Sequence, residues 1–152
     1  MKRILIATDG SHGAEAAVAD GLELARALDA SVLFATVRHQ PATSLGLGFP
    51  AYVYPLTVEE DGSRATADAA LAAAEKAGVK AEAVILQGVP AHQIVELARQ
   101  REVDLIVIGS RGLGAFAGAL LGSVSRAVAR EADRPVLIAK HREPAETVHA
   151  AA

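Results

Sequence analysis

The residues of this chain best suited to chemistry are small ones, spaced as Gly109-x2-Gly112-x9-Gly122-Ser123 after an apolar run that ends at Ile108. Such a run is typical of a strand buried on both faces, and a helical pattern begins at Gly122-Ser123. Glycines let backbone N–H groups approach an oxyanion, and a helix N-terminus adds unpaired donors and about half a positive charge. The pattern therefore predicts an anion site, although a glycine-rich turn without a ligand would have the same composition.

Two common phosphate-binding motifs are absent from this loop. No Gly-Lys-Ser/Thr sequence ends it, as a Walker A motif requires, and Ala117 stands where the dinucleotide motif would place its third glycine. The spacing resembles instead the ATP-binding signature of the universal stress protein family. The chain is also similar to that family at its start, Ile-Leu-Ile-Ala-Thr-Asp-Gly-Ser, and near its end, Arg-Pro-Val-Leu-Ile-Ala.

Composition excludes several other classes of protein. The 152 residues are enough for one domain, and a hydrophobic content of 51% argues against disorder. A net charge of −3 and 3% aromatic residues argue against nucleic-acid binding. The chain has no cysteine, which excludes disulfides and thiol catalysis, and its first apolar run is too short for a signal peptide or a membrane span. We expect a cytoplasmic protein that binds neither nucleic acid nor a membrane.

Apolar periodicity predicts alternating strands and helices. We expect strands at 4–7, 31–37, 80–87, 105–108 and 135–140, and helices at 11–28, 57–77, 90–100 and 122–132. Gly78 is expected to end the second helix. The segment 38–56, rich in glycine and proline, breaks the pattern and is either functional or mobile.

This alternation predicts a single α/β domain with an open, doubly wound, Rossmann-like parallel sheet of five strands and four helices. The family resemblance implies the strand order 3-2-1-4-5. Ligands bind such sheets at the carboxyl ends of the strands where the order reverses, so Thr8, Asp9 and Gly109 should border one crevice. We expect residues 1–140 to form a nucleotide-binding domain and 141–152 a polar, flexible tail.

The resemblance also implies residues that contact an adenine nucleotide, ATP foremost. Asp9 would hold Mg²⁺ or a ribose hydroxyl, unless it caps the following helix. Gly122 and Ser123 would offer N–H groups and a hydroxyl to phosphates, although Ser123 could also cap its helix. Arg111 is either a phosphate contact or a solvated charge. The backbone of Val37 would read the adenine edge. The complete expected set is Ala7, Thr8, Asp9, Val37, Ile108, Gly109, Arg111, Gly112, Gly122, Ser123, Val124 and Ser125.

The segment Leu113–Leu121 departs from the family pattern because it is uncharged, where many members carry Lys or Arg. This leaves the preference among ATP, ADP and AMP open. The five histidines lack metal-ligand spacing, and no general base is evident. We therefore expect a small stress-response sensor or switch that binds ATP with at most slow hydrolysis. One alternative is a dimeric scaffold without nucleotide. Another is an adenylating or pyrophosphatase enzyme, whose Ser-Gly-Gly-x-Asp-Ser loop does not match Asp9–Gly13.

The last predicted strand indicates how two copies would associate. Val136, Leu137 and Ile138 are apolar, yet the expected strand order places them at the edge of the sheet. An apolar edge with unpaired backbone groups promotes pairing or aggregation. Antiparallel pairing with a second copy would cover it, an arrangement similar to that of family members. We expect a homodimer joined through this strand.

Overall fold

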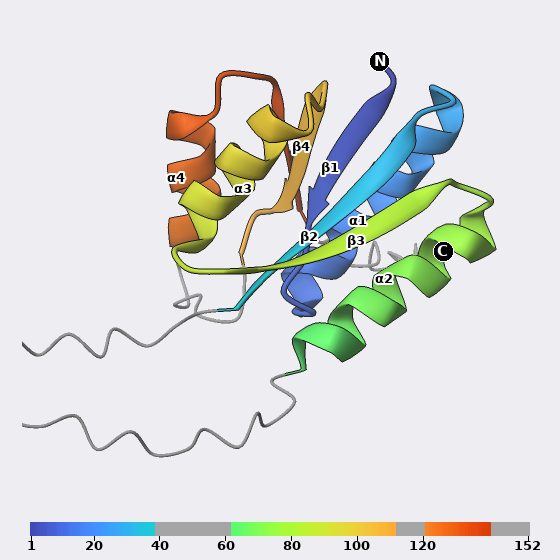
Figure 1. Ribbon diagram of the computed structural model, residues 1–152, viewed down its shortest axis with the longest axis horizontal. Helices are drawn as coiled ribbons and strands as arrows, with labels where there is room; N and C mark the ends of the chain where they lie inside the picture. The colour runs from blue at the N-terminus through green and yellow to red at the C-terminus, as the bar shows by residue number, and fades with distance from the viewer. Residues whose placement is uncertain (39–61, 112–120, 141–152) are drawn as a thin grey trace, which may run out of the picture.

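The computed structural model describes residues 1–38, 62–111 and 121–140, in which strands and helices alternate along the chain (Figure 1). The strands are β1 (Arg3–Ala7), β2 (Ser31–Arg38), β3 (Ala81–Gln87), β4 (Leu105–Gly109) and β5 (Val136–Ala139). The helices are α1 (His12–Ala27), α2 (Ser63–Ala77), α3 (Pro90–Gln100) and α4 (Ser123–Glu131). Apart from the start of α2, each boundary lies within one residue of its predicted position.

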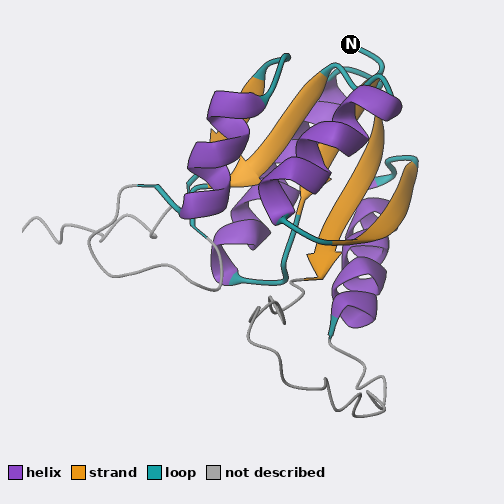
Figure 2. Cartoon of the chain, turned by 60° about the vertical axis from the view of Figure 1, so that its left-hand side comes forward, coloured by secondary structure: helices purple, strands orange, loops and turns teal. Residues whose placement is uncertain are grey.

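The five strands form one parallel sheet in the order β3-β2-β1-β4-β5, which confirms the predicted fold. Helices cover both faces of the sheet (Figure 2). Helices α1 and α2 contact each other on one face, and α3 and α4 contact each other on the other. The strand order reverses between β1 and β4, and at that point the helices change from one face to the other. A doubly wound sheet places its ligand site there.

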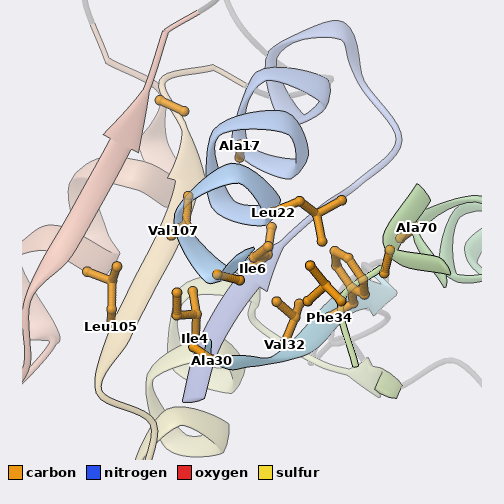
Figure 3. Packing of buried hydrophobic residues seen from close by; sticks show 14 residues of the cluster. Ile4, Ile6, Ala17, Leu22, Ala30, Val32, Phe34, Ala70, Leu105 and Val107 are labelled. Atoms are coloured by element: carbon orange, nitrogen blue, oxygen red, sulfur yellow. The ribbon is translucent and has the colours of Figure 1, made fainter. Parts of the chain in front are cut away.

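Two hydrophobic clusters explain why the strands are almost continuously apolar. Ile6, Phe34 and Val107 belong to the cluster under α1 and α2 (Figure 3), while Leu5 and Ile106 belong to the cluster under α3 and α4. All five side chains are fully buried. Because successive strand residues point to opposite faces, a sheet covered on both sides favours apolar residues at most positions.

Two details of the helices differ from the sequence prediction. Helix α2 begins at Ser63, six residues later than the predicted Thr57, because Gly62 occupies its N-cap in the left-handed conformation with φ +71°. Leu28, the last residue of the predicted helix 11–28, follows α1 as its C-cap and is 43% exposed. Gly78 ends α2 in the left-handed conformation with φ +70°, as predicted. Most of the segment 38–56 and all of 141–152 lie outside the described residues.

The edge of the sheet where the strands begin is held by ionic and backbone hydrogen bonds. The carboxylate of Asp104 accepts the N–H groups of Lys2 and Arg3 at 2.6 and 3.0 Å, and these bonds lower its pKa. Arg134 donates to the carbonyl of Val103 and to the carboxylate of Asp133. The bond from Arg134 lowers the pKa of Asp133 to about 2. In the part of the chain that the structure describes, no helix combines the length and apolar character needed to cross a bilayer.

Candidate functional site

A cleft of about 720 Å³ opens at the carboxyl ends of the strands, at the point where the strand order reverses. The structure gathers the sequence-predicted site residues in its lining. They are Ala7, Thr8, Asp9, Val37, Ile108, Gly109, Arg111, Gly122, Ser123, Val124 and Ser125. Gly112, the remaining residue of the predicted set, lies outside the described residues.

Two glycines bring the start of α1 against the end of β4, next to the cleft. A Cβ added to Gly109 would lie 2.3 Å from the carbonyl oxygen of Gly13, and one added to Gly13 would lie 2.0 Å from the carbonyl oxygen of Arg111. Both distances are far shorter than any real contact, so a side chain at either position would push the backbones apart. Gly109 thus serves close backbone packing, and Gly13, which the sequence analysis did not single out, is its partner.

The start of α4 supplies the cleft with backbone donors. The N–H group of Gly122, predicted to contact phosphate, instead donates to the carbonyl of Ser110 at 2.7 Å. The N–H groups of Ser123, Val124 and Ser125 belong to the first helical turn and have no acceptor within the helix. Gly122 is the N-cap, so the alternative that Ser123 caps the helix is wrong. The exposed Ser123 side chain makes no hydrogen bond with any described residue.

Ser125 has a different place, two residues further along the helix. Its side chain is 3% exposed, and its hydroxyl donates to the carbonyl oxygen of Gly109 at 2.6 Å. The bond ties the first turn of α4 to the end of β4. Because this hydroxyl is occupied within the protein, what Ser125 offers the cleft is its backbone N–H group.

Asp9 stands at the turn from β1 into α1. Its carboxylate accepts the N–H group of Ser11 at 2.9 Å, while the hydroxyl of Ser11 accepts the N–H group of Ala14 at 3.3 Å. Ser11 is therefore the N-cap of α1, and the alternative that Asp9 caps this helix is wrong. Within the described ranges no group of three or more His, Asp and Glu side chains could hold a metal ion. Mg²⁺ at Asp9 would thus need further oxygen ligands from a bound phosphate and from water.

The cleft changes in character along the sheet. On the side of β2 and β3 it is apolar, with Val37 at the end of β2, Val89 in the turn between β3 and α3, and Pro90 at the start of α3. On the side of β1 and β4 lie Asp9, Arg111 and the first turn of α4. Asp9 and Arg111 are the charged residues among the described cleft residues and carry opposite charges. An anion here would be held chiefly by helix N–H groups and Arg111 rather than by a large net charge.

Seven cleft residues were not predicted from the sequence. All are apolar, and most come from α3 or the turn that precedes it: Ala14, Ala35, Val89, Pro90, Ala91, Ile94 and Ala127. Their periodicity resembles that of ordinary core residues, and Ala35, Ala91 and Ile94 are indeed buried. The sequence does not distinguish them from core residues; in the structure Val89 stands out because it is 68% exposed.

Fold and cleft together define a doubly wound α/β protein with a ligand site at its switch point. Residues 1–140 match the model of the universal stress protein family, and the chain belongs to this family. It is 36% identical over 143 residues to universal stress protein MJ0531 of Methanocaldococcus jannaschii, with 91% of this chain and 82% of the relative covered.

Solved structures show the same fold. One is a universal stress protein in complex with cAMP, with a TM-score of 0.69 and 31% identity, covering 91% of this chain and 96% of that one. Another is the universal stress protein from Archaeoglobus fulgidus in complex with dAMP, with a TM-score of 0.66 and 28% identity, covering 92% and 98%.

Proposed function

We propose that the protein binds an adenine nucleotide, ATP foremost, in this cleft and acts as a cytoplasmic stress-response sensor. The observation that carries the proposal is the division of the cleft. An apolar side at β2 and β3 suits a flat ring, and a helix start beside Arg111 suits phosphates. The two structural neighbours described as complexes with cAMP and dAMP support an adenine nucleotide as the ligand.

The residues present fit such a ligand from end to end. The ring would lie against the apolar side, where the backbone of Val37 is available to its polar edge. The phosphates would accept the N–H groups of Ser123 and Val124, with the hydroxyl of Ser123 as a further donor. Asp9 would contact a ribose hydroxyl or a phosphate-bound Mg²⁺.

The same geometry favours binding over rapid turnover. Asp9 is the one carboxylate among the described cleft residues, and it already accepts the N–H group of Ser11. Efficient phosphoryl transfer to water requires a group that positions the attacking water, as well as charge stabilisation. Arg111 is the one positively charged residue among the described cleft residues that could stabilise the charge of the transition state. We therefore propose at most slow ATP hydrolysis.

We further propose that two copies join through β5, the edge strand of the sheet. The carbonyls of Pro135 and Ala139 accept N–H groups from β4 and the loop after it. The backbone groups of Val136 and Ile138 therefore point outward, because N–H and C=O directions alternate along a strand. The side chains of Val136 and Ile138 pack against the cluster under α3 and α4, so Leu137, which is 39% exposed, is the apolar side chain available to a partner.

A short backbone path joins the cleft to this edge. Ser110 accepts the N–H group of Gly122 at 2.7 Å and donates its own N–H group to the carbonyl of Ala139 at 2.8 Å. A shift of the first turn of α4 on phosphate binding would thus reach β5 through one residue. We propose this path as the means by which nucleotide state alters the dimer and its binding to other proteins.

Mass spectrometry of the small molecules released from purified, denatured protein tests the binding proposal. We expect an adenine nucleotide in stoichiometric amount, and calorimetric titration of the emptied protein with ATP, ADP and AMP then ranks the three. Absence of a co-purified nucleotide, together with no heat of binding for any of them, would contradict the proposal. That result would favour the dimeric scaffold instead.

A further inference from the structure

The main chain of Arg111 lies between the starts of two helices, α1 and α4. A Cβ added to Gly13, in the first turn of α1, would lie 2.0 Å from the carbonyl oxygen of Arg111 and 3.6 Å from its Cα. On the other side, a Cβ added to Gly122 would lie 3.4 Å from the same Cα. Because Gly13 has no side chain, the carbonyl of Arg111 can rest directly against α1.

The side chain of Arg111, in contrast to its main chain, is not held by the protein. It is exposed, lines the cleft, and makes no hydrogen bond or ion pair with any residue in the described ranges. Two arginines of α4 do have partners, because Arg126 donates to the carbonyl of Leu121 at 3.2 Å and Arg130 pairs with Glu131 at 2.9 Å. An unpaired cation on a fixed main chain pays little ordering entropy when it binds an anion.

The place of Arg111 indicates which phosphate of a nucleotide it would meet. The phosphate next to the ribose would accept the N–H groups of Ser123 and Val124 at the start of α4. Arg111 lies two residues beyond the end of β4, and its carbonyl rests on α1, which packs on the opposite face of the sheet from α4. A chain of two or three phosphates would therefore extend from α4 past the end of β4 and reach Arg111, whereas a single phosphate would stay at α4.

We propose that Arg111 gives the cleft a preference for ATP over AMP, and that Gly13 is the residue that positions it. The inference rests on the proposed nucleotide binding and makes the start of α1 a determinant of ligand choice. A guanidinium donates from a rigid fork that matches phosphate oxygens, so its contribution depends on where its main chain stands. A side chain at position 13 would have to increase the 2.0 Å distance to the ordinary contact distance of at least 3.4 Å.

The variant Arg111→Gln tests the preference, measured as the ratio of the AMP and ATP dissociation constants in calorimetric titrations. We expect the dissociation constant of ATP to rise about tenfold, as for one hydrogen bond between charged groups, and that of AMP to stay within about twofold. Arg26→Gln is the matched control, because it removes the same charge from an exposed arginine in the last turn of α1, outside the cleft lining. It should leave the ratio unchanged.

The variant Gly13→Ala and its combination with Arg111→Gln test the positioning role. Gly13→Ala should weaken ATP binding by about as much as Arg111→Gln does and leave AMP binding within about twofold of the wild-type affinity. In the double variant the two losses should not add, because both act on the same guanidinium. A glycine needed only for the fold would weaken both nucleotides, and its effect would add to that of Arg111→Gln. Circular dichroism without nucleotide checks that each variant is folded.

Several outcomes would overturn the inference while leaving the proposed nucleotide binding intact. One is a wild-type protein that binds AMP and ATP equally, and another is an unchanged ratio in Arg111→Gln. Equal losses for AMP and ATP would place Arg111 at the first phosphate instead. Additive losses in the double variant, or a Gly13→Ala protein that does not fold, would refute the positioning role, while Arg111→Gln still decides the preference. If the wild-type protein binds neither nucleotide, the proposed function itself fails.

Discussion

Removing the hydroxyl of Ser125 should destabilise the protein, whereas removing that of Ser123 should not. The Ser125 hydroxyl is buried and donates to the carbonyl of Gly109 at 2.6 Å. Ser125→Ala loses this bond and leaves a buried carbonyl with one acceptor position unfilled, which costs about 1–3 kcal/mol. For a domain of this size, that free energy corresponds to a fall in melting temperature of about 2–12 °C. The freed first turn of α4 should also bind ATP more weakly.

Ser123→Ala is the matched control because it removes the same atom two residues earlier. The Ser123 side chain is exposed and makes no hydrogen bond with the described residues. The free energy of unfolding should therefore change by less than about 0.5 kcal/mol. If the hydroxyl donates to a phosphate, the affinity for ATP should fall about tenfold, as expected for one hydrogen bond to a charged group.

Urea unfolding of both variants without nucleotide, followed by calorimetric titration with ATP, measures the two quantities separately. The reasoning predicts a clear stability loss for Ser125→Ala and a loss confined to affinity for Ser123→Ala. Equal stability losses in the two variants would refute the assignment of the anchoring bond to Ser125. A fully stable Ser125→Ala protein would show that this bond contributes little to holding α4 on β4.

Four further predictions concern other parts of the structure. Gly122→Ala should fold and bind ATP nearly as the wild type, because a Cβ there has contacts no closer than 3.4 Å. Gly122→Val should have the circular dichroism spectrum of a folded protein but lose ATP binding in titration, because its γ-carbons would occupy the space proposed for the phosphates. Asp9→Ala should reduce Mg²⁺-dependent ATP affinity more than thermal stability, because Ser11 rather than Asp9 caps α1; unchanged affinity would remove Asp9 from the site. The pKa of Asp133 is lowered from 3.8 to about 2, so its ionised form stabilises the folded state at neutral pH, and this stabilisation is lost as the pH falls from 3.8 to about 2. The melting-temperature difference between wild type and Asp133→Ala should therefore shrink from about pH 5 to about pH 2. A difference that stays constant over this range would contradict the prediction. Leu137→Lys should convert a wild-type dimer into a monomer that still binds ATP, as measured by light scattering and titration, and a wild-type monomer at micromolar concentration would exclude the β5 interface.

Much of the fold could be predicted because its signals are local. Strands buried on both faces leave continuous apolar runs, and the helices between them leave a period near 3.6. The start of α2 was misplaced for a physical reason. The sequence is compatible with helix on either side of Gly62, and only the left-handed conformation of that glycine shows where the helix begins.

The polar side of the cleft was predictable and its apolar side was not. Glycines and a serine before a helix at that spacing match a phosphate-binding signature, so this side of the cleft can be proposed from the chain alone. The hydrogen-bond partners of individual groups cannot be predicted in this way. The N–H group of Gly122 is taken by Ser110, and the hydroxyl of Ser125 by Gly109, because both depend on how closely α4 lies against β4.

The apolar side escapes prediction because burial in a core and contact with a ring require the same residue types. Ile94 and Ala91 are buried in the core cluster and line the cleft at once. Val89 differs because core packing does not account for it: its side chain is largely in water, and its N-cap position favours a polar residue. Exposure, which only the structure supplies, therefore shows that core packing does not explain Val89. Val89 also lines the cleft, so the turn before α3 borders it as the start of α4 does.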